Sequence, residues 1–370
     1  MQQDIWILGA TGRTGRGIAL DLDRRGLPVV LLGRDRARLV AVAASLGQEP
    51  RIVTGTFAEQ LAAIGEGRTS GDQDDDRPSI VVNTVGPFTT TALQVARALP
   101  TGWGYLDLSN EYPAVDDVLR LDRTAARAGQ SLLPGAGFGV TATESLVVHL
   151  TAGRSRPERV HVDAIASLAS EAGTLGTALA ESIAAVAAFG GGSVRSGRFV
   201  RSMSTVSGTQ TITTPDGDTV TTASGASAEL RAAWLASDAD EVTAGSMLAP
   251  TSPWIRPVLP VLTGLFRVPP IRRLAVSRIA RVRMREQPMA RTHSWAHARV
   301  EWSSGEVRRA WIRLGDAEEY TIAMAAEVAA RLSRGEGTPG ASTPATMFGA
   351  GLAESVGAVY IDEATTKGTR

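Results

Sequence analysis

Three glycines near the start of the chain, Gly9, Gly12 and Gly15, constrain its fold most strongly. They follow the apolar run 5–8 and open a segment, 15–25, whose apolar residues recur at helical spacing. In a strand–turn–helix unit, such glycines allow a tight turn, a close approach of backbone to ligand and close helix–strand packing, while the first helical amides attract an anion. This spacing favours a loop that binds the pyrophosphate of a dinucleotide over a purely structural turn. We expect the loop to comprise Gly9, Ala10, Thr11, Gly12, Arg13, Thr14 and Gly15.

The first 138 residues alternate short apolar runs with helical patterns. The expected strands are 5–8, 28–32, 51–53, 79–83, 105–108 and 131–134, and the expected helices are 15–25, 34–46, 58–64, 91–99 and 114–128. The run 79–83 is almost continuously apolar, which is typical of a strand buried on both faces of a parallel sheet. The alternation predicts right-handed crossovers and a doubly wound, parallel Rossmann sheet in an α/β protein.

The pattern changes after the glycine-rich stretch 135–139. The expected elements are then a helix at 143–152, a strand at 159–165, a helix at 174–189, threonine-rich strands within 209–222 that turn at 215–218, a hairpin of 292–302 with 307–314, and a helix at 321–332. These elements predict a second, α+β domain with a mostly antiparallel sheet.

The residue counts exclude several classes of site. The chain has no cysteine, which excludes disulfides, thiolate metal sites and cysteine nucleophiles. Lys367 is its single lysine and lies in the polar C-terminal tail, so lysine-based catalysis and a Walker lysine have no candidate. With 38 basic and 38 acidic residues, the chain has no net field to attract nucleic acid.

We expect a cytoplasmic protein without a membrane span. Asp4 interrupts the first apolar run, which does not resemble a leader peptide, and arginines and prolines interrupt the apolar stretch 253–270. The acidic triplet 74–76 lies in a loop rich in glycine and aspartate and is interpreted as solvated surface, with a metal site as the alternative.

The end of the second strand distinguishes between nicotinamide cofactors. An NAD site usually carries a carboxylate there for the ribose 2′-hydroxyl, whereas here Arg34 precedes Asp35. Arginine can pair with a 2′-phosphate through two hydrogen bonds, and Arg13 could flank the same phosphate. The sequence therefore favours NADP over NAD, although Asp35 keeps NAD open.

Two further loops follow strands at the edge where open α/β sheets bind ligands. The first, at the end of the fourth strand, is expected to run along the cofactor, with Phe88 against the nicotinamide; it comprises Asn83, Thr84, Val85, Gly86, Pro87 and Phe88. In the second, alternation places Tyr105 and Asp107 on one face of the fifth strand, and Glu111 follows in the loop. These three are candidate proton donors, with capping or packing as the alternative for each.

His293 and His297 could be a metal pair at helical spacing, but their surroundings alternate as a strand. We therefore expect no metal site and retain His293 as a further candidate proton donor. His149 and His161 are interpreted as surface or packing residues.

The chain resembles the saccharopine dehydrogenase-like reductases, including their trans-acting enoyl reductase branch. The resemblance covers about residues 4–140 and rests on the glycine loop, the sequence Leu-Leu-Gly-Arg-Asp at 31–35, the loop 83–88, the stretch 105–111 and Pro-Gly-Ala-Gly-Phe at 134–138. It implies an NADP-binding Rossmann domain over 1–138, an α+β domain over 139–340 that holds substrate and mediates a homodimer, and a C-terminal segment, 341–370, that returns to the first domain.

The expected activity is NADPH-dependent reduction of a C=N or conjugated C=C bond in a small-molecule or carrier-bound biosynthetic substrate. Saccharopine dehydrogenase activity itself is not expected, because its lysine chemistry has no candidate here. A protein that binds NADP without hydride transfer is the alternative. The sequence does not identify the substrate. The stretch 254–291 carries nine arginines against one acidic residue, and it could be a docking surface for an anionic partner, a lid, or a solvated face.

Overall fold

A computed structural model describes residues 3–67, 79–167, 173–174, 180–181, 184–185, 188–202, 208–247, 264–266, 268–284, 289, 291–364 and 366–367. The chain divides by its internal contacts into two compact units. The first unit comprises Met1–Ser109, Pro113–Gly137 and Glu318–Met347, and the second comprises Asn110–Tyr112, Phe138–Ala317 and Phe348–Arg370.

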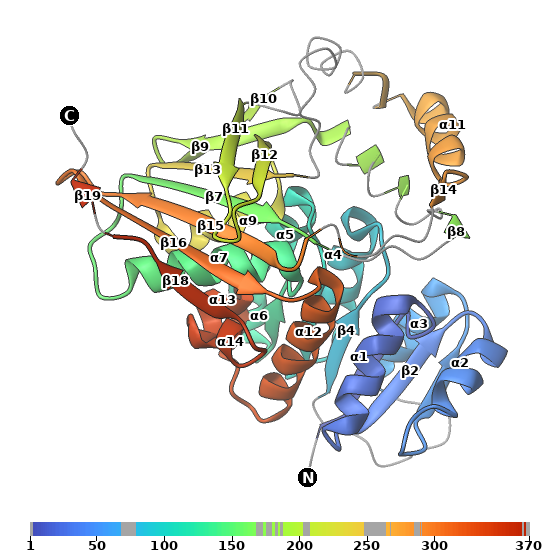
Figure 1. The fold of residues 1–370 in the computed structure, drawn as a ribbon. Coiled ribbons are helices and arrows are strands. Elements are labelled where there is room, and N and C mark those ends of the chain that lie inside the picture. Colours follow the sequence, from blue (N-terminus) through green and yellow to red (C-terminus); the bar gives the residue numbers. More distant parts are fainter. Residues whose placement is uncertain are drawn as a thin grey trace. The chain divides into compact units, whose positions relative to one another are not determined.

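The first unit is built on a parallel sheet of seven strands in the order β17-β6-β5-β4-β1-β2-β3. Figure 1 labels β2 and β4 of this sheet. Its strands are β1 Ile5–Leu8, β2 Val29–Gly33, β3 Arg51–Thr54, β4 Ile80–Asn83, β5 Gly104–Asp107, β6 Ser131–Leu133 and β17 Gly340–Ala341. The strand order reverses between β1 and β4, where doubly wound sheets bind ligands at their carboxyl edge. The structure thus confirms the predicted parallel Rossmann sheet.

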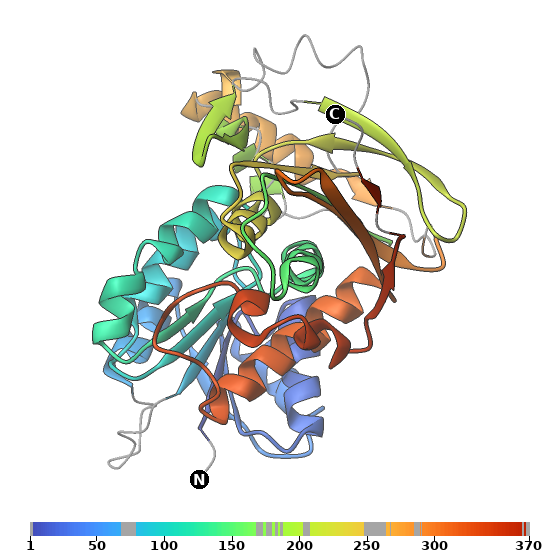
Figure 2. The same cartoon turned by 90° about the vertical axis from the view of Figure 1, so that its left-hand side faces the viewer.

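Burial explains why these short runs form the centre of the sheet. All residues of β1, β2, β4 and β5 are buried, because helices cover both faces of the sheet (Figure 2). The helices of this unit are α1 Arg13–Arg24, α2 Arg36–Ala43, α3 Phe57–Glu66, α4 Phe88–Ala98, α5 Tyr112–Leu119, α6 Asp122–Arg127, α12 Ala317–Ser333 and α13 Pro344–Phe348. Trp6 and Trp103 pack in the core with ring centroids 5.3 Å apart.

The second unit contains a mixed sheet of ten strands, of which seven follow the order β10-β9-β13-β7-β15-β16-β18. All pairs are antiparallel except β13 with β7. The strands are β7 Arg159–Ile165, β9 Gly191–Arg195, β10 Arg198–Ser202, β11 Gly208–Thr213, β12 Thr219–Ser224, β13 Glu241–Ser246, β15 Ser294–Glu301, β16 Glu306–Leu314, β18 Val359–Asp362 and β19 Thr366–Lys367. The prediction of a mostly antiparallel α+β unit is confirmed.

Helices α7 and α9 pack against this sheet. The remaining elements of the unit are α7 Phe138–Thr151, α9 Ala228–Ser237, α11 Pro269–Ile279, α14 Gly351–Glu354, and the two-stranded sheet of β8 Gly173–Thr174 with β14 Arg283–Met284. Both predicted hairpins are present: β11 and β12 turn at Gly217, and β15 and β16 turn at Gly305, each glycine having a positive φ.

The expected domain limits were 1–138, 139–340 and 341–370, and the contacts divide the chain differently. Residues 318–347 belong to the first unit, because α12 packs against α1 and the parallel sheet. A Cβ at Gly17 would lie 2.5 Å from Ile322, and Arg25 is bonded to Glu327 at 2.7 Å. The C-terminal residues beyond Met347 are in the second unit, where β18 extends the mixed sheet.

Local differences from the expected elements are small. The expected helix 114–128 is divided into α5 and α6, and α7 begins at Phe138 rather than at residue 143. Most of the expected helix 174–189 and most of the acidic loop 65–77, including the triplet 74–76, lie outside the described residues.

Candidate functional site

The glycine loop forms a tight turn at the carboxyl end of β1. Gly9 has a φ of +87°, its amide donates to the Leu32 carbonyl at 3.1 Å, and its carbonyl accepts from the Gly12 amide at 2.9 Å. A Cβ at Gly15 would lie 2.5 Å from the Gly9 carbonyl oxygen. The first glycine is therefore required by its backbone conformation, and the third by the close packing of α1 on the turn.

Thr84 connects this loop to the end of β4. Its Oγ1 donates to the carbonyl of Leu8 at 2.8 Å and approaches that of Gly9 at 3.3 Å. A Cβ at Gly9 would lie 2.6 Å from the same Oγ1. Two of the predicted cofactor-binding segments are thus in contact, at the position where the strand order reverses.

The start of α1 has a cationic side chain and no acidic residue in its first turn. Its N-cap is Gly12, which has no side chain to bond the first helical amides. Arg13 and Thr14 instead bond a carboxylate from α12: Glu318 Oε1 lies 2.6 Å from Arg13 Nε and 3.3 Å from Thr14 Oγ1. Arg13 is thus bonded to Glu318, and its position beside a 2′-phosphate stays a prediction.

Arg34 and Asp35 follow β2 and differ in their hydrogen bonds and ion pairs. Asp35 caps α2, since its Oδ1 accepts from the Arg38 amide at 3.1 Å, and its carboxylate lies 3.6 Å from the Arg38 guanidinium. Arg34 is exposed, and in the described part of the chain it forms no ion pair. Thus the carboxylate of Asp35 is bonded at the start of α2, while the guanidinium of Arg34 beside it is exposed.

The loop after β4 is fixed by its own hydrogen bonds. Asn83 Oδ1 accepts from the Val85 amide at 3.0 Å, and the Val85 carbonyl accepts from Thr91 Oγ1 at 2.5 Å. The Gly86–Pro87 peptide bond is cis, and Pro87 is the N-cap of α4. Phe88 opens α4 and is half-buried against the core of the first unit.

Tyr105 and Asp107 form a buried network with Asn83. The Tyr105 hydroxyl donates to Asp107 Oδ2 at 2.7 Å and lies 3.3 Å from the Asn83 amide nitrogen. Asp107 Oδ1 accepts from the Ser109 amide and hydroxyl at 2.9 and 2.5 Å, and from the Gly135 amide at 2.9 Å. Burial raises the pKa of both Tyr105 and Asp107, although the donors around Asp107 oppose the rise in its case.

The four predicted proton donors differ in burial and surroundings. Tyr105 and Asp107 have no exposed surface, and they bond each other in the first unit. Glu111 belongs to the second unit, is 4% exposed and pairs through its backbone with Ser227. His293 also belongs to the second unit, where its Nδ1 lies 2.8 Å from Asp216 Oδ2.

Sequence reasoning missed Glu229, a buried carboxyl in the first turn of α9. With its amide correctly oriented, Asn110 donates to both oxygens of Glu229 at 2.9 and 2.8 Å. Burial raises the pKa of Glu229, while Ser227 and Asn110 oppose the rise. A Cβ at Gly139 would lie 2.1 Å from Glu229 Oε1. An acidic residue in an alanine-rich helix gives no signal for such a contact, because its partners are distant in the sequence.

A second missed group surrounds Asp163 on the mixed sheet. Its Oδ2 lies 2.9 Å from His161 Nε2, 3.4 Å from His297 Nδ1 and 2.7 Å from Gln210 Nε2, and its Oδ1 accepts from Thr222 at 2.7 Å. Burial alone would raise the pKa of Asp163, but hydrogen bonds from the two histidines and Thr222 outweigh it and hold the pKa well below its usual range. The predicted strand around His297 is β15, and Trp295 and His297 share one of its faces, opposite Ile165 and Asp163.

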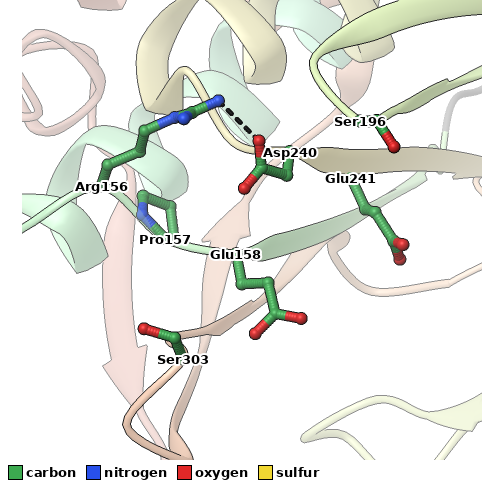
Figure 3. Close-up of a pocket in the computed structure, with 7 residues that line it drawn as sticks. All are labelled: Arg156, Pro157, Glu158, Ser196, Asp240, Glu241 and Ser303. Atoms are coloured by element: carbon green, nitrogen blue, oxygen red, sulfur yellow. Dashed lines mark hydrogen bonds and ion pairs between the residues drawn. The ribbon is translucent and has the colours of Figure 1, made fainter.

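A surface cavity of about 580 Å³ in the second unit contains none of the predicted site residues (Figure 3). It is lined by Arg156, Pro157, Glu158, Ser196, Asp240, Glu241 and Ser303. Its acidic side chains are already neutralised: Asp240 lies 2.8 Å from Arg156, and Glu158 and Glu241 lie 3.1 and 3.0 Å from Arg159. The glycine loop is therefore a better candidate for ligand binding than this cavity.

No family model matches the sequence, and no curated protein matches it. Solved structures that resemble parts of the fold include reductases and dehydrogenases. A carbonyl reductase from Pseudomonas aeruginosa aligns at 19% identity over 36% of this chain and 80% of its own, with a TM-score of 0.28. A short-chain dehydrogenase from Sphingobium yanoikuyae in complex with NADPH aligns at 20% identity over 36% of this chain and 71% of its own, with a TM-score of 0.28.

A third structure spans nearly the whole chain. The WlbA dehydrogenase from Thermus thermophilus, in complex with NAD and UDP-GlcNAcA, aligns at 13% identity over 96% of this chain and 93% of its own, with a TM-score of 0.41. These likenesses are weak. We therefore infer function from the residues of this chain alone.

Proposed function

We propose that the chain is an NADPH-dependent reductase that transfers hydride to a C=N or conjugated C=C bond of a small-molecule or carrier-bound substrate, in the manner of saccharopine dehydrogenase-like reductases. The observation that carries this proposal is the glycine turn at Gly9. Thr84 contacts this turn through its hydroxyl, at the place between β1 and β4 where the strand order reverses. The exposed Arg34 lies at the end of the neighbouring strand β2.

The chain's own groups fit such a cofactor. Gly9 and Gly15 keep the turn tight, because a side chain at either position would meet Thr84 or the Gly9 carbonyl. Gly12 between them is exposed, so its backbone is open to phosphate oxygens. Arg13 and Thr14 bond the Glu318 carboxylate, which supports the proposal that groups at the start of α1 can donate to an anion, although Glu318 now occupies them. Arg34, with Asp35 engaged at α2, supports NADP over NAD.

In this proposal the residues of the first unit bind and position rather than react. A bound NADPH would supply the hydride, which carries both electrons of the reduction, and a side chain or water would supply the proton. Arg34 would bind the 2′-phosphate, and the glycine loop would hold the pyrophosphate. The buried Tyr105–Asp107 pair would fix the start of the loop after β5, because Asp107 bonds both Ser109 and Gly135. We propose Glu111 and His293 as the remaining candidates for proton transfer to substrate.

Binding of NADP without hydride transfer is the second candidate. It is favoured by the burial of Tyr105 and Asp107, which are bonded to each other and have no exposed surface for a substrate. On this alternative the chain would be a sensor or a non-redox enzyme built on the same fold.

Two measurements separate the candidates. NADPH binding is followed by the change in nicotinamide fluorescence, and turnover by loss of nicotinamide absorbance in the presence of cyclic imines and enoyl thioesters. The reductase proposal predicts binding together with consumption for one class of substrate. Tight binding without consumption by either class would support the second candidate, and absence of binding would contradict both.

A further inference from the structure

Exposed apolar side chains gather on one segment of the second unit. In the part of the chain that the structure describes, eight large apolar side chains are exposed, and five of them lie between residues 265 and 282. They are Leu265, Val268, Ile271, Leu274 and Val282, and Leu274 has the largest exposed fraction of the eight, 59%. The segment includes α11 and its flanks, and we call residues 264–284 the basic segment.

The basic segment also has an apolar inner side of its own. Val276 is 9% exposed and packs with Ala180 and Ala184, and Phe266 and Ile279 are packed against the same group. The helix is therefore attached to its unit by one set of apolar side chains, while Ile271 and Leu274 form a second set that faces solvent. One apolar face is enough to hold a short helix against its unit, so folding does not require the second, exposed set.

The charge of the basic segment has one sign. Its sequence contains six arginines, and no aspartate or glutamate stands between residues 264 and 284. Five of the six lie in the described residues: Arg272, Arg273, Arg278, Arg281 and Arg283. Arg273, Arg278 and Arg281 are exposed, and within the described residues none of the five forms an ion pair. This differs from the rest of the chain, where arginines are commonly paired with acids.

Helical spacing brings both kinds of side chain to the outer side of α11. Ile271, Leu274 and Arg278 are separated by three or four residues, which places them in a row on one face of α11. Arg281 follows in the turn after the helix ends at Ile279. Leu274 and Arg278 are both exposed, as this row requires. The outer side thus presents branched apolar groups next to unpaired guanidinium groups.

We propose that the basic segment binds the surface of a bilayer that contains anionic lipids. Apolar side chains would enter the boundary between headgroups and acyl chains, and the arginines would pair with lipid phosphates and carboxylates. An acidic protein surface would satisfy the arginines but not Ile271 and Leu274. No helix in the described residues is long and apolar enough to cross a membrane, so the contact is with the surface. This inference is independent of the proposed reductase function.

Cosedimentation of the full chain with lipid vesicles tests the proposal. Vesicles of phosphatidylcholine with phosphatidylserine should bind the protein, and vesicles of phosphatidylcholine alone should not. Ile271→Ser with Leu274→Ser, and separately Arg278→Gln with Arg281→Gln, should each weaken binding roughly tenfold or more. The matched control is Val200→Ser, which removes another exposed apolar side chain, 45% exposed on β10; it should leave binding unchanged.

Unchanged thermal unfolding of each variant shows that the fold is retained, which the exposure of these side chains leads us to expect. Raised salt should release the wild-type protein from the anionic vesicles. No binding to anionic vesicles, or equal binding by wild type and both double variants, would overturn the proposal. Concentration-dependent self-association that the Ile271→Ser and Leu274→Ser variant abolishes, without vesicle binding, would instead identify a second copy as the occupant.

Discussion

Glu318 and Arg13 form the contact that most directly affects the proposed cofactor site. Glu318 Oε1 lies 2.6 Å from Arg13 Nε, and the same oxygen lies 3.3 Å from Thr14 Oγ1. Arg13 and Thr14 open α1, and Glu318 lies in the first turn of α12. A carboxylate of the protein therefore neutralises the cationic side chain at the helix start where a phosphate would bind, and it opposes a second anion at that position.

The first prediction concerns Glu318→Gln, which removes this negative charge while retaining an oxygen that can accept from Arg13. We expect NADPH affinity to rise roughly twofold to fivefold, the range typical of one charge near a helix terminus. Fluorescence titration measures the change, with Glu319→Gln as the exposed neighbouring control. Equal or weaker binding by Glu318→Gln would show that the carboxylate supports the site rather than opposing the ligand.

The second prediction concerns Arg34→Ala. If Arg34 binds the 2′-phosphate, the substitution should weaken NADPH roughly tenfold to hundredfold, as expected for a charge-assisted hydrogen bond, and should leave NADH nearly unchanged. The control is Arg38→Ala, which removes a nearby guanidinium that is paired with Asp35 at 3.6 Å. It should leave the affinity for both cofactors nearly unchanged. Comparable loss of NADPH and NADH affinity in Arg34→Ala would contradict the assignment of NADP specificity.

Periodicity in the sequence predicted the fold because burial determines it locally. The apolar runs that became β1, β2 and β4 are buried in the parallel sheet, and the glycines predicted for the first turn have the required φ or packing, as at Gly9 and Gly15. The place of α12 was not predictable, because its contacts with Arg13, Gly17 and Arg25 join segments from opposite ends of the chain. A helical pattern indicates an apolar face but not the surface that it covers.

Contacts between neighbouring residues of the candidate site were predicted from the sequence, and contacts between distant segments were missed. Alternation placed Tyr105 and Asp107 on one face, and their side chains are bonded. The hydrogen bonds that Asp107 accepts from Ser109 and Gly135 were not predicted, because Gly135 follows a separate strand. Alternation places His161 and Asp163 on the same face of β7, but the other partners of Asp163, Thr222 and His297, come from separate strands and could not be foreseen.

The third prediction concerns Asp107→Asn, which replaces one acceptor oxygen of a buried carboxyl with a donor. Because Asp107 accepts from Tyr105, Ser109 and Gly135, we expect the free energy of unfolding to fall by about 1–3 kcal/mol. Urea unfolding measures the loss, and Ser109→Ala, which removes one donor only, should cost less. Unaltered stability with loss of turnover would instead indicate that Asp107 acts on substrate.

The fourth prediction concerns the pH dependence that Asp163 gives to stability. Its folded-state pKa lies well below the ordinary value of 3.8, so its contribution is present above that value and is lost as pH falls through the folded-state pKa. Asp163→Asn should therefore lower the free energy of unfolding by about 2 kcal/mol or more at neutral pH and progressively less below about pH 4. Urea unfolding across this range measures the difference.

Asp216→Asn is the control for this prediction. It removes an exposed carboxylate that pairs with His293, and it should give a smaller pH-dependent loss, because solvent screens that pair. A wild-type advantage over Asp163→Asn that stays constant from neutral to acidic pH would show that packing, rather than the ionised carboxylate, accounts for the contribution of Asp163.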